Sequence, residues 1–149
     1  MQRINQHEFL MQVLRGNADA VEMCEQIFQV SQVIDDLVDQ DKPITSAEVI
    51  KTFWVALIEL PANPFYRRHE LVIRPLMAGA LQDWTDSVSL EREGDVHGKH
   101  LAFVLRDQLT SLVIQCAYLV GGYKWMQEIG VPVRRYFHDE GLIEYINNL

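Results

Sequence analysis

One stretch of the chain decides its fold: residues 19–39 read DAVEMCEQIFQVSQVIDDLVD. Apolar side chains recur in it three and four residues apart, so a helix gathers them along one face and leaves the opposite arc polar. Such a segment is typical of a helix that packs its apolar face against other helices. The apolar positions are Val21, Cys24, Ile27, Phe28, Ile34 and Val38, with the small Ser31 at the rim.

Capping patterns predict two further helices downstream. Thr45 and Glu48 form a T-x-x-E capping box, in which each side chain can satisfy a free backbone N–H. The box predicts a helix over about residues 46–60, and Pro61 is expected to end it. Asn63 is followed by a proline, which is the preferred arrangement for the start of the next helix.

Glycine and proline predict the boundaries of other helices. A short helix begins at Asn5 or His7 and stops at Gly16. Pro75 interrupts an apolar run, so we expect a break or kink over residues 71–76.

The C-terminal part of the chain predicts the longest helix. The polar residues 85–98 are interpreted as a loop, and residues 100–129 as one helix. Gly130 is expected to cap this helix, and Pro132 to start a last one. Because no strand pattern or repeat is evident, the sequence predicts an all-α protein: an antiparallel bundle of about six helices in a single domain, residues 1–149.

The bulk composition is that of a soluble globular protein. Hydrophobic residues make up 48% of the chain and charged residues 23%. A formal net charge of -8 argues against nonspecific nucleic-acid binding, which needs a basic surface. The same charge would favour the capture of cations or of a basic protein partner.

Cysteine usage and hydropathy predict a cytoplasmic protein. Cys24 and Cys116 lie in apolar helical patterns and are expected to be buried free thiols, as in a reducing compartment. Residues 1–6 lack the apolar core of a secretion signal. The most hydrophobic stretch, residues 109–120, is too short to cross a bilayer, so no membrane span is expected.

Three aspartates at the end of residues 19–39 are the strongest chemical signal. The D-D-x-x-D spacing of Asp35, Asp36 and Asp39 gathers three carboxylates into one patch on a helix. In a last turn each opposes the helix dipole by about 0.3–1 kcal/mol, and the three repel one another. A bound Mg²⁺ would relieve both penalties, because hard cations take carboxylate oxygens. The patch is therefore predicted to bind Mg²⁺, and a plain solvated polar face is the alternative.

The motif also carries a resemblance. Residues 28–39, FQVSQVIDDLVD, resemble the first aspartate-rich helix of the all-α isoprenoid synthases, particularly the squalene and phytoene synthase branch. In that family the carboxylates hold Mg²⁺, which grips the diphosphate of a prenyl substrate. The resemblance implies an isoprenoid-synthase-like bundle in which Asp35, Asp36 and Asp39 are the metal ligands. It implies ionisation or hydrolysis of the diphosphate as the reaction, helped by metal neutralising the leaving group.

The rest of such a site has looser candidates. For the second acidic motif of the family the loose candidates are Asp107, or Asp83 with Asp86, and neither forms the paired aspartates of that motif. The chain is shorter than family members, which implies a reduced relative or a site built by a homodimer. Arg106 and Lys124 are the predicted diphosphate binders because both lie in the long helix, although Arg106 could instead pair with Asp107 or a nearby acid.

Two other metal-dependent families offer weaker matches. Glu22 and Glu25 resemble part of the acidic helices of the all-α nucleoside triphosphate pyrophosphohydrolases. His138-Asp139 is the dipeptide of the HD-type phosphohydrolases, but no aspartate follows it.

Further polar and aromatic residues are candidates for a ligand cavity. His97 and His100 stand together at an expected helix start, where they are either a candidate metal pair or, as is commoner, a surface pair. Gly121-Gly122 inside a helix costs about 1 kcal/mol per glycine, which indicates a close crossing, a kink or a ligand near the backbone. Six aromatic residues could line an apolar pocket, although aromatic residues more often fill a bundle core. The six are Phe53, Trp54, Trp84, Tyr118, Tyr123 and Trp125.

The rival interpretation belongs to another class. The chain would be a non-catalytic interaction or assembly protein, with its acidic helix or an apolar helix face against a protein partner. Aspartates that face an enclosed cavity with Arg or Lys opposite would support the enzyme. Aspartates that face water would support the interaction protein.

Overall fold

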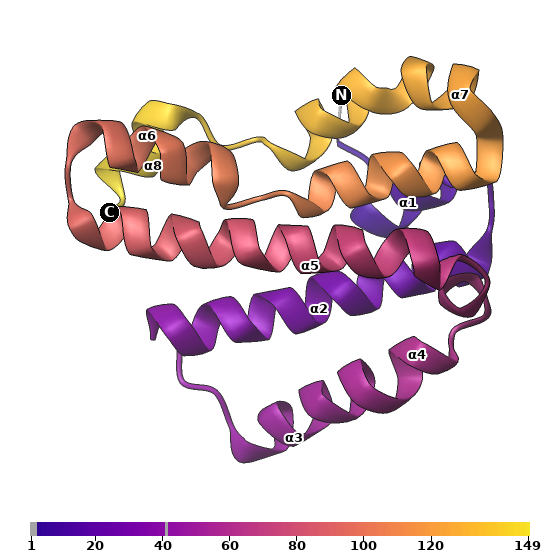
Figure 1. Ribbon diagram of the computed structural model, residues 1–149, viewed down its shortest axis with the longest axis horizontal. Helices are drawn as coiled ribbons and strands as arrows, with labels where there is room; N and C mark the ends of the chain where they lie inside the picture. The colour runs from indigo at the N-terminus through magenta and orange to yellow at the C-terminus, as the bar shows by residue number, and fades with distance from the viewer. Residues whose placement is uncertain (1–2, 41) are drawn as a thin grey trace. The chain divides into compact units, whose positions relative to one another are not determined.

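The computed structural model describes residues 3–40 and 42–149, and these residues form helices and no strand (Figure 1). The predicted all-α class is confirmed. By its internal contacts the chain divides into two compact units, Met1–Glu70 and Leu71–Leu149. The expectation that residues 1–149 form a single domain stays a prediction.

In the first unit α2 is the central helix, and the other helices pack against it (Figure 1). The predicted helix over residues 19–39 is thus the organising element of this unit, and it starts within one residue of its expected position. The elements are α1 (Gln6–Val13), α2 (Ala18–Asp39), α3 (Ser46–Trp54), the π-helical turn η1 (Val55–Glu59) and α4 (Leu60–Ala62).

Side-chain caps begin these helices where the sequence predicts. Asn5 accepts a hydrogen bond from the Glu8 N–H, and Thr45 accepts one from the Glu48 N–H. Asn63 caps α5 and also donates its amide to the Asp19 carbonyl at 3.0 Å, which ties the end of α4 to the start of α2. The buried residues beneath them include Leu10, Val13, Leu14, Val21, Met23, Cys24 and Ile27.

The predicted helix end at Pro61 is wrong, because the backbone stays helical through Pro61 to Ala62. The Leu60 N–H bonds to the carbonyl of Val55, five residues back, which makes the wider π turn. A proline ring clashes with the carbonyl four residues before it, and a wider turn just upstream accommodates that crowding.

The second unit contains most of α5 and all of the later helices. Its elements are α5 (Pro64–Glu93), which begins in the first unit, α6 (Val96–Leu105), α7 (Leu109–Phe137) and α8 (Leu142–Asn147). The predicted break over residues 71–76 is displaced: Pro75 lies inside α5, and the one non-helical residue of that helix is His69. The distortion lies six residues before the proline, beyond the carbonyl at position 71 that its ring crowds directly.

The predicted loop over residues 85–98 is also wrong, because α5 continues to Glu93 and α6 starts at Val96. The hydroxyls of Thr85 and Ser87 donate to the carbonyls of Leu81 and Trp84 within the helix, so polar side chains stay satisfied without leaving it. Only a short connection around Gly94, at φ 82°, separates the two helices.

The predicted helix over residues 100–129 is interrupted. It is broken over residues 106–108 and kinked at Gly122, whose φ of 85° is open only to glycine. The kink confirms one of the three roles considered for the glycine pair. Gly130 and Pro132 neither end nor start a helix, since α7 runs through both. The neighbouring Ile129 and Val133 are buried, and their packing outweighs these local preferences.

Cys24 and Cys116 are free and buried, as predicted. By length and composition alone, one helical stretch of the described chain, Val96–Asn147, is apolar enough to cross a membrane. This is weak evidence of a span, because the core helix of a water-soluble protein meets the same criteria. The absence of a span stays a prediction.

Candidate functional site

The three predicted metal ligands lie in the last turns of α2 and are buried to different degrees. Asp36 is 7% exposed, and its Oδ1 accepts a hydrogen bond of 3.0 Å from the Gln32 side-chain amide. Asp35 is half-buried and Asp39 is exposed. The last turn of α2 contains no basic residue, and Gln40 ends the helix in a left-handed conformation. The carboxylates thus oppose the helix dipole as predicted.

The geometry does not gather these carboxylates into a metal centre. Within residues 3–40 and 42–149, no group of three or more His, Cys, Asp or Glu side chains could hold a metal ion. The amide of Gln32 on Asp36 provides a local partner for a carboxylate at this helix end. Mg²⁺ binding by Asp35, Asp36 and Asp39 stays a prediction.

The polar groups of the second unit gather around Arg106, which follows α6. Its guanidinium pairs with Glu140 at 3.0 Å from Nη2 to Oε1. It also lies 4.5 Å from the ring centroid of Tyr145 and 5.1 Å from that of Phe103. The alternative considered for Arg106, an ion pair with a nearby acid, is confirmed. The acid is Glu140 and comes from beyond α7.

Asp107 lies next to Arg106 and contacts a histidine. Its Oδ2 is 3.6 Å from Nδ1 of His138, an ion pair when the histidine is protonated. Partial burial raises the pKa of the Asp107 carboxyl above its ordinary value, although the charges of His138 and Arg106 act to lower it. We call Arg106, Asp107, His138, Glu140 and Tyr145 the Arg106 cluster.

Tyr145 joins this cluster to α5. Its side chain is 6% exposed, and its hydroxyl donates a hydrogen bond to Glu91. The ring lies 5.2 Å from that of Phe103, centroid to centroid. Burial, followed by the hydrogen bond to Glu91, raises the pKa of the Tyr145 hydroxyl. The cluster therefore fastens α8 to α5 and α6 through internally paired groups.

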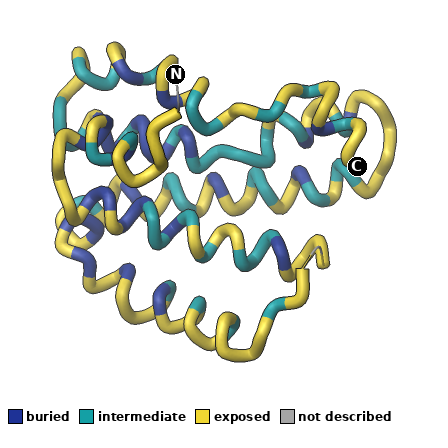
Figure 2. Tube along the Cα trace, turned by 180° about the vertical axis from the view of Figure 1, so that it is seen from behind, coloured by how far each residue is buried: buried dark blue, intermediate teal, exposed yellow. Residues whose placement is uncertain are grey.

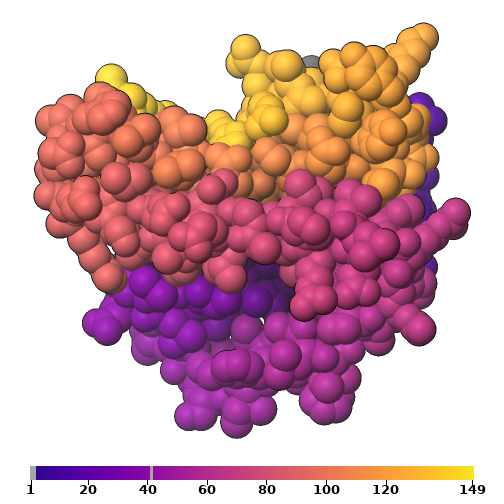
Figure 3. All heavy atoms as spheres, viewed as in Figure 1, coloured from indigo at the N-terminus to yellow at the C-terminus, as the bar shows by residue number. Residues whose placement is uncertain are grey.

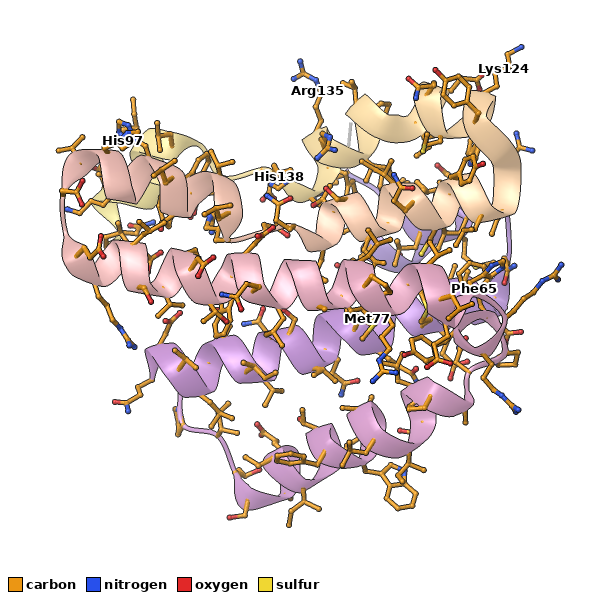
Figure 4. The ribbon with its side chains drawn as sticks, viewed as in Figure 1. Phe65, Met77, His97, Lys124, Arg135 and His138 are labelled. Atoms are coloured by element: carbon orange, nitrogen blue, oxygen red, sulfur yellow. The ribbon has the colours of Figure 1, made fainter. Side chains whose placement is uncertain are left out.

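The other predicted diphosphate binder, Lys124, is exposed and follows the kink at Gly122. Figure 4 shows it projecting away from His138, the partner of Asp107. Lys124 and the Arg106 cluster are thus not brought together. The roles of Arg106 and Lys124 in diphosphate binding, and of Asp107 in a second acidic site, stay predictions.

The remaining candidates are placed separately. His97 and His100 are both exposed on α6. Glu25 pairs with His7 of α1 at 3.0 Å, and Asp86 accepts a hydrogen bond from the Gln82 amide. Each of these two acids therefore has a partner within the fold.

A surface that the sequence did not single out lies on α3 and η1. Five large apolar side chains are exposed there, although α3 and η1 pack along α2. Figure 2 colours most of this segment as exposed. The space-filling view also shows the side chains of this segment at the surface (Figure 3). The residues are Ile50, Phe53, Trp54, Leu57 and Ile58, at 50–68% exposure, and we call them the α3–η1 face.

The sequence interpretation favoured the bundle core for the two aromatic residues of this face, Phe53 and Trp54. The structure instead buries only Val55 of η1 and Leu60 of α4, and no residue of α3. The i, i+3, i+4, i+7 spacing of these residues is the sequence pattern that could have identified the face. That spacing describes an apolar helix face equally well whether a core or a partner covers it.

Comparison with known proteins adds no relative: no protein family, curated protein or solved structure was found to match this chain.

Proposed function

We propose that this protein is a non-catalytic interaction module that binds a protein partner through the α3–η1 face. The observation that carries the proposal is the exposure of five large apolar side chains on one helix face. Fully burying such a side chain is worth about 1.5–3 kcal/mol relative to leaving it in water. A partner that covers the face would therefore gain affinity from residues that the fold itself leaves uncovered.

The packing of the segment supports this proposal. Val55 and Leu60 already anchor it, at 3% and 5% exposure. Phe53 and Trp54 are 63% and 57% exposed, and aromatic side chains are the most frequent anchors of protein interfaces. The π turn lies within the face, and such turns recur at functional sites.

The test compares quantitative affinity capture by the wild-type chain and by a Phe53→Ser, Leu57→Ser double variant. Leu71→Ser is the matched control, because Leu71 is 92% exposed and lies outside the face. We expect the double variant to lose the captured partner, or the self-association, that the wild-type chain shows. We expect the Leu71→Ser control to keep it. Sedimentation as a monomer, with no capture that depends on Phe53 and Leu57, would contradict the proposal.

A second candidate function is Mg²⁺-dependent binding of a diphosphate-bearing ligand, with Asp35, Asp36 and Asp39 as the metal ligands. The observation that favours it is the acidic last turn of α2, which itself contains no basic residue. The finer fold proposal, an isoprenoid-synthase-like antiparallel bundle of about six helices, belongs to this candidate. Calorimetric titration with Mg²⁺ and a prenyl diphosphate tests it, and unchanged binding by an Asp35→Ala, Asp39→Ala variant would exclude this site.

A further inference from the structure

The segment that contains the α3–η1 face also has most of the net charge of the protein. Residues 18–62, which cover α2 to α4, contain nine acidic and two basic residues. The rest of the chain contains twelve acidic and eleven basic residues and is therefore close to neutral. Most of the net negative charge of the chain therefore lies in the segment that exposes these apolar side chains.

Acidic side chains stand at both ends of the face. Glu48 lies in the first turn of α3 and Glu59 ends η1, and both are exposed. Asp39 is exposed at the end of α2, against which α3 packs. Lys51 is the one basic residue that the sequence places among residues 46–62. An occupant of the face would thus meet an apolar stripe with acidic ends.

We propose that the occupant of the α3–η1 face is a cationic amphipathic helix of a partner protein. This inference rests on the proposed function. A helix face of this spacing is matched by the apolar stripe of a second helix, whose side chains pack between its own. Basic residues flanking that stripe would face Glu48 and Glu59 and would be drawn to the net acidic segment.

Two other occupants fit the charges less well. A second copy docked face to face would bring together two segments that each contain nine acidic residues. Such like-charge contact opposes association. An anionic membrane surface would be repelled for the same reason, because membrane-surface helices rely on basic residues.

The experiment titrates the protein, residues 1–149, with designed peptides by calorimetry. The probe is a Leu/Lys amphipathic helix of about 18 residues, roughly five turns. A Leu/Glu helix of the same pattern and a scrambled Leu/Lys peptide are the controls for charge and for amphipathicity. We expect the Leu/Lys helix to bind, more weakly at higher salt, and both controls to bind at least about tenfold more weakly.

Protein variants locate the binding site. Phe53→Ser with Leu57→Ser is expected to weaken binding of the Leu/Lys helix by at least about tenfold. Glu48→Gln with Glu59→Gln is expected to weaken it several-fold. Leu71→Ser and Glu144→Gln, both at exposed positions outside the face, are expected to leave it unchanged. Equal binding by the Phe53→Ser, Leu57→Ser variant would overturn the inference, because the peptide would then bind elsewhere.

The remaining outcomes separate this inference from the proposed function. If the Leu/Glu helix binds as well as the Leu/Lys helix, the face binds apolar helices without charge selection, and only the inference fails. If neither helix binds but the chain sediments as a dimer that Phe53→Ser and Leu57→Ser dissociate, the occupant is a second copy, and again only the inference fails. A monomer that binds neither helix overturns both.

Discussion

The α3–η1 face and the Arg106 cluster differ in how their side chains are satisfied. On the face, Phe53 and Trp54 are exposed although α3 packs along α2. In the cluster, Arg106 pairs with Glu140, and the buried Tyr145 bonds to Glu91, all within one unit. Large apolar side chains left in water indicate a binding surface, whereas internally paired charges around a buried ring indicate a structural fastening. The charged side chains of the Arg106 cluster are thus less available to a ligand than the apolar side chains of the α3–η1 face.

The largest expected effect is at the buried ring of the Arg106 cluster. Tyr145→Ala should lower the free energy of unfolding by about 3–5 kcal/mol, as for other buried aromatic residues. Ile143→Ala is the control on the same helix, and because Ile143 is 77% exposed we expect a change within about 0.5 kcal/mol. Urea denaturation measures both. Equal effects of the two substitutions would show that α8 is not fastened by Tyr145.

A smaller effect is expected at the ion pair. Arg106→Met keeps the apolar stem but removes the pair with Glu140, and both side chains are 32% exposed, so solvent screens the charges. We expect a loss of about 1 kcal/mol in the free energy of unfolding. A double-mutant cycle with Glu140→Gln measures the coupling energy directly. A coupling energy of zero would show that the Arg106–Glu140 ion pair does not stabilise the fold.

The pH dependence of Asp107 is expected to be smaller still. Burial raises its folded pKa above the ordinary value of 3.8, so folding favours the protonated carboxyl. The stabilising contribution is full below that ordinary value and is lost as pH rises through the folded pKa. Relative to an Asp107→Asn variant, the wild-type chain should therefore lose stability as pH rises above 3.8. Urea denaturation of both proteins across the acid range measures this.

The opposite trend would overturn the assignment for Asp107. If the wild-type chain gained stability relative to the variant over that range, the charges of His138 and Arg106 would outweigh burial. The carboxylate would then be stabilised in the folded state.

The smallest effect on stability is expected on the α3–η1 face. Leu57→Ala should change the free energy of unfolding by no more than about 0.5 kcal/mol, because Leu57 is 66% exposed. Leu60→Ala is a matched substitution in the same segment at 5% exposure, and it should cost about 2–5 kcal/mol. Thermal unfolding of the two variants compares them. Similar losses would place Leu57 in the core and remove the basis for a binding surface.

Local signals predicted the start of helices well. The caps at Asn5, Thr45 and Asn63 bond to N–H groups three residues ahead, so the sequence neighbourhood contains everything that they need. The predicted loop before Val96 is wrong because Thr85 and Ser87 bond back to their own helix. The predicted helix start at Pro132 is wrong because buried neighbours keep the backbone helical around it.

The candidate site depended on side-chain exposure within α2 and on contacts far apart in the sequence. Asp35, Asp36 and Asp39 share one helix, yet the Gln32 amide bonds to Asp36 and the three differ in exposure. The pairing of Arg106 with Glu140 joins residues separated by all of α7, so no local pattern could reveal it.

By itself the sequence determined the all-α class, the amphipathic α2, the main caps and the concentration of negative charge in residues 18–62. These follow from periodicity, from bonds between near neighbours and from composition. The tertiary structure decided which apolar helix face is buried and which is left in water. Periodicity specifies that a helix has an apolar face, but only the surrounding helices determine whether that face is covered.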